Sequence, residues 1–140
     1  MTTTKNILEK IQVTLTQPEM RFTLPKGYPN VTASHLKWLT YVTSSTGGSI
    51  MSLDIFELEQ AGIKLQDTNG GNNKRYYVSM PLDPSSQVTN IYANFTGALD
   101  KDYDLPISIN TLTFKVLING ILANDITPSN PIQLEIVLYK

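Results

Sequence analysis

Three aspartates at alternate positions have the spacing in this chain that comes closest to a metal site. Asp100, Asp102 and Asp104 carry carboxylate oxygens, which are the ligands that Ca²⁺ prefers. An EF-hand loop that starts at Asp100 also needs a glycine at its sixth position and a glutamate at its twelfth. These positions hold Leu105 and Thr111, so an EF-hand is excluded. Two interpretations stay open: a looser cation site in an exposed loop, or a solvated acidic loop.

The sequence does not indicate catalytic partners for the histidine or for the other carboxylates. His35 is the single histidine, whereas a cupin-type metal site needs several histidines and a carboxylate. Asp54, Glu57 and Glu59 could suggest a glycosidase pair, but alternation predicts Glu57 and Glu59 on one wet face of a strand. The chain has no cysteine and no GxSxG motif. We therefore expect neither an enzyme nor a bound cofactor.

Tyrosines in predicted loops are the candidates for contact with a ligand or a neighbouring subunit. Tyr28 and Tyr103 lie in polar, Pro- or Asp-rich stretches, where an exposed ring could stack on a sugar or anchor an interface. Trp38 alternates with Leu36 and is predicted to lie in the core.

Composition and charge exclude several classes of protein. The 140 residues fit one domain, and the net charge of −1 comes without a basic stripe of the kind that nucleic-acid binding requires. Only 16% of residues are charged, against about 25% in typical domains, which suits a surface partly covered by partners. The sequence shows no signal peptide and no apolar run near the roughly 20 residues that span a bilayer. We expect synthesis in the cytoplasm, without membrane insertion or direct contact with nucleic acid.

Any site in this chain must be positioned by β-strands. Apolar residues alternate with a period of two along much of the sequence, and this pattern predicts strands with one buried face. It is clearest at the C-terminal end, where Leu112, Phe114, Val116 and Ile118 alternate and the segment 132–139 repeats the pattern. Further alternating runs lie at 11–15, 20–24, 36–42, 76–80 and 91–95. The segment 50–58 is ambiguous, because Leu53, Phe56 and Gln60 would also share a helical face, and we favour a strand there.

About eight strands without a long helix predict an all-β fold. We expect a single eight-stranded antiparallel β-sandwich of jelly-roll topology over residues 10–140, preceded by a flexible arm over 1–9. Gly and Pro content predicts a loop at 25–30, and polar composition predicts another at 98–106. An immunoglobulin-like sandwich is the main competitor, although its Cys…Trp…Cys pattern is absent.

The second half of the chain resembles a known family of structural proteins. A strand ending in Met-Pro-Leu-Asp-Pro at 80–84 is followed by Phe-Lys-Val-Leu-Ile-Asn-Gly at 114–120, by Asp-Ile-Thr-Pro-Ser-Asn-Pro at 125–131, and by the last alternating run. This order is similar to the single jelly-roll minor capsid or penton-type proteins of large icosahedral double-stranded DNA viruses and virophages. The resemblance implies a structural virion component, without catalytic residues, in a closed homo-oligomer that is a pentamer at a capsid vertex or a minor component elsewhere in the shell.

Two hypotheses of different kinds therefore remain. In the first, the chain is a penton or minor capsid protein that contacts copies of itself and neighbouring capsid proteins. In the second, it is a carbohydrate- or ligand-binding β-sandwich module of the lectin kind, for which Tyr28, Tyr103 and the loop with Asp100, Asp102 and Asp104 would supply contacts.

Overall fold

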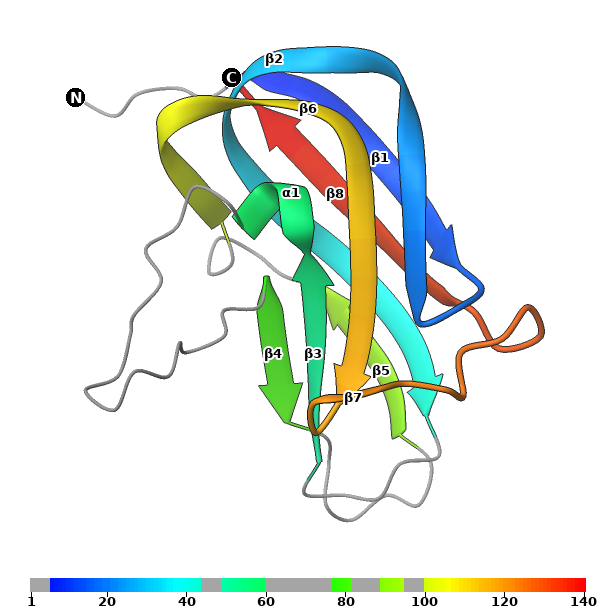
Figure 1. The fold of residues 1–140 in the computed structure, drawn as a ribbon. Coiled ribbons are helices and arrows are strands. Elements are labelled where there is room, and N and C mark those ends of the chain that lie inside the picture. The colour runs from blue at the N-terminus through cyan, green and yellow to red at the C-terminus, as the bar shows by residue number, and fades with distance from the viewer. Residues whose placement is uncertain (1–5, 44–48, 60–76, 82–88, 95–99) are drawn as a thin grey trace, which may run out of the picture.

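The computed structural model describes residues 6–43, 49–59, 77–81, 89–94 and 100–140. Within these ranges the chain is all-β, with one short helix (Figure 1). The strands are β1 (Ile7–Leu15), β2 (Glu19–Thr43), β3 (Ile50–Ile55), β4 (Val78–Pro81), β5 (Thr89–Asn94), β6 (Asp100–Ile118), β7 (Ile121–Leu122) and β8 (Ile132–Tyr139), and the helix is α1 (Phe56–Glu59). None of the described helical residues forms a segment long and apolar enough to cross a membrane.

One antiparallel sheet contains all the described strands. Its order is β1-β8-β2-β6-β3-β4, with β5 paired to β2 and β7 paired to β6. The first strand therefore lies beside the last, with Val13 opposite Leu134 and Leu15 opposite Ile132. The backbone of Asn6 extends this pairing by hydrogen bonds of 3.2 and 2.8 Å with Lys140.

Two long strands, β2 and β6, bend together and curl the sheet over itself (Figure 1). Residues 19–23 of β2 pair with 111–115 of β6, whereas residues 33–35 pair with 100–102. Between these stretches the register shifts around Tyr28 and Val31. Beyond the bend, residues 33–40 of β2 pair with β8 and residues 38–43 pair with β5. The same two strands thus belong to both parts of the curled sheet.

Buried side chains from both parts of the sheet form one apolar core. The alternating residues of β8 and most of those of β6 are fully buried, as their pattern predicts, and Ile118 packs partly buried against them. The fully buried members at 0% exposure are Leu112, Phe114, Val116, Ile132, Leu134, Ile136 and Leu138. Leu36 and Leu39 of β2 face them together with Leu53 and Ile55 of β3. The prediction of two C-terminal core strands is confirmed.

The predicted loop at 25–30 is wrong, because these residues continue strand β2 through its bend. Pro25 and Pro29 have no N–H to give to a ladder, and both are exposed where the pairing is irregular. Asn30 has a φ of 62°, which asparagine tolerates better than most residues. The chain therefore bends sharply while it stays extended, and two predicted strands become one strand of 25 residues.

Three further boundaries differ from the prediction. Strand β6 begins at Asp100 rather than after a loop at 98–106, because the backbone of β2 pairs with it whatever the polarity of its side chains. Strand β3 ends at Ile55, and the residues after it form α1. The predicted arm over 1–9 is too long, since β1 begins at Ile7, while residues 1–5 lie outside the described part.

Candidate functional site

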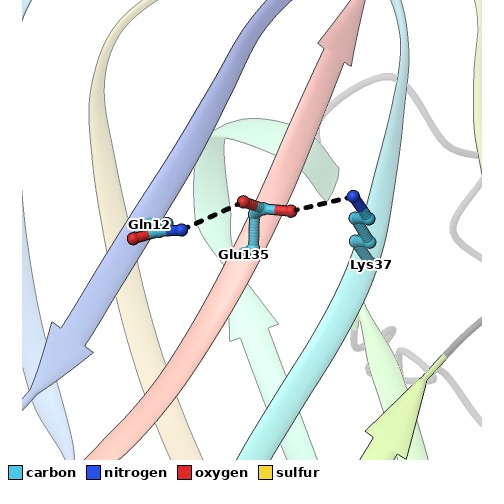
Figure 2. Close-up of polar contacts among 3 residues, drawn as sticks. All are labelled: Gln12, Lys37 and Glu135. Carbon is cyan, nitrogen blue, oxygen red and sulfur yellow. Dashed lines mark hydrogen bonds and ion pairs between the residues drawn. The ribbon is translucent and has the colours of Figure 1, made fainter.

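A polar cluster crosses three strands on the outer face of the sheet (Figure 2). Glu135 lies on β8, between Gln12 of β1 and Lys37 of β2. The Nε2 of Gln12 donates to Oε1 of Glu135 at 3.3 Å, and the Nζ of Lys37 lies 3.6 Å from Oε2. Both oxygens of the carboxylate therefore have a partner, one on each neighbouring strand.

Strand register brings these three side chains together. Residues 132, 134, 136 and 138 of β8 face the core, so alternation turns Glu135 outward. Gln12 is directly opposite Glu135 in the β1–β8 pairing. On the other side the register shifts between Leu36 and Trp38, which leaves Lys37 as an extra residue next to the carboxylate.

The prediction that Trp38 lies in the core is wrong, and the same register shift explains why. Leu36 pairs with Ile136 on the core side, but after the shift Trp38 pairs with Glu135 on the outer side. Leu39 and Tyr41 take the core positions instead and are 0% and 1% exposed. Trp38 is therefore half-buried on the outer face and not in the core.

Glu135 is a buried carboxylate whose two partners are an ammonium and an amide. Glu135 is 6% exposed although it faces outward, while the side chain of Lys37 is 48% exposed. An ammonium and an amide N–H are both suitable donors to a carboxylate, and a bond that involves a charged partner is the stronger kind. Among the described residues, no group of three or more His, Asp or Glu side chains is arranged to hold a metal ion. The cluster joins β1, β8 and β2 and leaves about half of the Lys37 side chain in solvent.

Removal of the ammonium should have a small, salt-dependent effect on stability. Because half of the Lys37 side chain is in solvent, we expect Lys37→Met to lower the free energy of unfolding by about 0.5–1 kcal/mol at low salt and by less at 1 M salt. Urea unfolding at two salt concentrations measures this difference. Lys10→Met is the matched control, since Lys10 is exposed and its side chain makes no ion pair with a described residue. An equal loss in both variants would contradict a specific role for the Lys37–Glu135 pair.

Tyr28 is buried rather than exposed in a loop, so the premise that made it a contact candidate is wrong. It lies in the bend of β2 opposite Ile109 and is 8% exposed. Its hydroxyl donates to Oε2 of Glu9 at 2.9 Å, and the Nζ of Lys26 lies 5.3 Å from the ring centroid. Tyr28 thus fastens the bend of β2 to β1.

This hydrogen bond predicts a loss of stability at alkaline pH. The bond to Glu9, followed by burial and the negative charge of Glu9, raises the pKa of Tyr28 above its usual value of 10.0. Because the folded state holds the proton more tightly, the contribution is complete below about pH 10 and is lost as the pH rises through the raised pKa. Urea unfolding between about pH 9 and 11.5 should show a smaller decline for Tyr28→Phe than for the wild type. Parallel declines would contradict this assignment.

Tyr103 is also buried, in strand β6 and not in a loop, so the same premise is wrong for it. It is 9% exposed, and its hydroxyl lies 2.7 Å from Oγ of Ser34 on β2. The hydroxyl of Tyr77 lies 2.9 Å from the same Oγ. This buried hydroxyl cluster joins β2, β6 and the residue that precedes β4, and it accounts for a fully buried serine in the core.

The three candidate cation ligands lie in strand β6. The backbones of Asp100 and Asp102 pair with His35 and Ala33 of β2, so the exposed loop expected for them is wrong. The side chains of Asp100, Asp102 and Asp104 lie outside the described part of the chain, and a cation site there stays a prediction. His35 is 7% exposed within β2, and its place opposite Val137 agrees with a structural position.

Glu57 has a structural role at the end of β3. It lies in α1 and accepts hydrogen bonds from the Oγ1 of Thr111 at 3.0 Å, the backbone N–H of Thr113 at 2.6 Å and the Oγ1 of Thr113 at 2.8 Å. Asp54 is half-buried in β3, and the side chain of Glu59 lies outside the described part. Glu57 and Glu59 therefore do not share a strand face, because the strand has ended at Ile55.

The cluster of Gln12, Lys37 and Glu135 is not among the sites that the sequence predicts. Each residue occupies an outward position of an alternating strand, where a polar side chain is the common case. Only the pairing of the first strand with the last brings Gln12 to Glu135, and only the register shift in β2 adds Lys37. No local signal in the sequence indicates either event.

Comparisons with known proteins give no family for this chain. No protein-family model matches it. No curated protein is significantly similar to it.

Proposed function

We propose that the chain is a jelly-roll shell subunit, a penton or minor capsid protein that forms a closed homo-oligomer, with a pentamer favoured. The observation that carries this proposal is the path of β2 and β6 through both parts of the sheet. If the two parts of the curled sheet are taken as two layers, the strand orders are β1-β8-β2-β5 and β2-β6-β3-β4, and β2 belongs to both. The first strand then lies beside the last. This arrangement supports an eight-stranded jelly roll, an architecture found in viral capsid and lectin domains.

Exposed apolar side chains support an assembling role over a ligand-binding one. Ile50 and Ile121 are 49% and 70% exposed, and the turn between β6 and β7 brings them to one end of the molecule. Exposed apolar groups that lie together mark contact surfaces between proteins. No described observation favours the lectin-like alternative, since Tyr28 and Tyr103 are buried. The proposal therefore assigns this end of the sheet to a contact between subunits.

A single charge in this surface should separate assembly from folding. We expect Ile121→Asp to keep the strand-type circular dichroism spectrum and to lose closed rings in negative-stain electron microscopy, because a carboxylate would be buried without a partner at the contact. Ile7→Asp is the matched control: Ile7 is 54% exposed, and β1 begins at the opposite end of the molecule from β7 (Figure 1). Rings in both variants would contradict the assigned surface, and no rings in the wild type would contradict the proposed assembly.

A further inference from the structure

The turn between β6 and β7 contains the sequence Asn119-Gly120, and it is exposed in the single subunit. Its residues have φ values of 52° and 81°, the positive values that a type I′ hairpin turn requires at both central positions. A Cβ placed on Gly120 would meet no heavy atom within 4 Å. Among the described residues, none therefore packs against the Cα of Gly120 on the side where a side chain would lie.

The side chain of Asn119 is held on the start of β3 by both of its polar atoms. Its Oδ1 accepts from the backbone N–H of Ile50 at 2.9 Å, and its Nδ2 donates to Oγ of Ser49 at 3.2 Å. Its own backbone N–H donates to the carbonyl of Ile50 at 2.9 Å. These three bonds, which we name the Asn119 clamp, hold the carboxamide on the residues at the start of β3.

We propose that Asn119 is a site of spontaneous deamidation and that the Asn119 clamp controls its rate. In this reaction the backbone nitrogen of Gly120 attacks Cγ of Asn119, and a C–N bond forms. The bond from Cγ to Nδ2 breaks, and the nitrogen leaves as ammonia with the proton from the Gly120 amide. Water then opens the cyclic imide at one of its two carbonyls, which gives aspartate or isoaspartate without any oxidant or reductant.

The two products would act differently on the sheet. An aspartate keeps an acceptor for Ile50 N–H but loses the Nδ2 donor to Ser49. An isoaspartate places an additional methylene in the main chain between the paired residues Ile118 and Ile121. The lengthened turn would lose the hairpin register and release the first residues of β3 from β6. Modification at this turn is therefore an irreversible loosening of the sheet.

Peptide mapping after incubation of the full chain at neutral pH, folded and in urea, tests this proposal. Trypsin releases residues 116–140 with Asn119 and residues 65–74 with Asn69-Gly70, a second Asn-Gly sequence that serves as the standard in urea. We expect isoaspartate at both sites in urea, and formation at Asn119 slower by about tenfold or more in the folded chain, because the clamp must open first.

A variant of the clamp separates protection by these bonds from folding in general. Ser49→Ala removes the acceptor of Nδ2, and we expect it to speed the reaction of folded Asn119 by about two- to tenfold. Ser108→Ala, at an exposed position of β6, is the control and should change nothing. Equal rates in the folded and unfolded chain would overturn the proposal. The proposal would also be overturned if Asn119 did not react in urea while Asn69 did. It would be overturned as well if Ser49→Ala left the rate at Asn119 in the folded chain unchanged.

Discussion

Replacement of Phe114 by alanine should lower the free energy of unfolding by about 3–5 kcal/mol, the largest single effect that we expect in this chain. Phe114 is fully buried on β6, where it pairs with Met20 of β2 and Ile55 of β3. Its ring meets Phe22 edge to face, with centroids 5.8 Å apart and planes at 76°. Truncation would remove this contact and leave a cavity that the surrounding strands fill only in part. Urea unfolding followed by fluorescence or circular dichroism measures the loss.

Phe56→Ala is the matched control for Phe114→Ala. Phe56 carries the same side chain but lies in α1 and is 57% exposed, so we expect a change within about 0.5 kcal/mol. Because assembly stabilises folded subunits by mass action, both variants are compared at one protein concentration. A similar loss in the two variants would contradict the placement of Phe114 at the centre of the core.

Replacement of Glu57 by alanine should cost about 1.5–3 kcal/mol, although the residue is only half-buried. Strand β3 ends at Ile55, and beyond that residue the carboxylate of Glu57 takes the place of a strand as the partner of Thr111 and Thr113 on β6. Removal of the carboxylate leaves the backbone N–H of Thr113 without this acceptor. We expect hydrogen exchange at Thr113 to become faster in proportion to the loss measured by urea unfolding.

Glu19→Ala is the control for Glu57→Ala. Glu19 is also next to β6, but its side chain is 53% exposed and its contact with Lys115 is a 3.9 Å surface ion pair. We expect at most about 1 kcal/mol for its removal. If Glu57→Ala costs no more than Glu19→Ala, the carboxylate does not hold α1 on the sheet. A larger loss that leaves exchange at Thr113 unchanged would contradict its role as the acceptor for that amide.

Alternation of apolar residues predicted the strands whose core face is uninterrupted. Leu134 and Ile136 show why: each sits in a strand with a regular register, and the side-chain period of two then gives burial directly. The prediction failed where pairing with a neighbouring strand keeps the backbone extended although its side chains are typical of a loop. Pro25 and Pro29 are typical of loops, and yet they continue β2, because β6 bends beside it.

The candidate site was less predictable than the fold. Tyr28 and Tyr103 appear in polar stretches of the sequence, but the hydroxyls that suggested solvent are satisfied by Glu9 and Ser34 inside the molecule. The contacts of Glu135 depend on pairing across 123 positions of the sequence and on a register shift. Local periodicity carries no information about such partners, because a strand pattern indicates only which face is buried.

Absolute mass in solution, from size exclusion with multi-angle light scattering over a range of concentrations, is the most direct test of the proposed assembly. A pentamer would weigh five times 15.6 kDa, which is about 78 kDa. We expect a single species near this mass whose size does not grow with concentration, because a closed ring has no free contact surface left. A chain that stays at 15.6 kDa at every concentration, or one that grows without limit, would contradict a closed homo-oligomer.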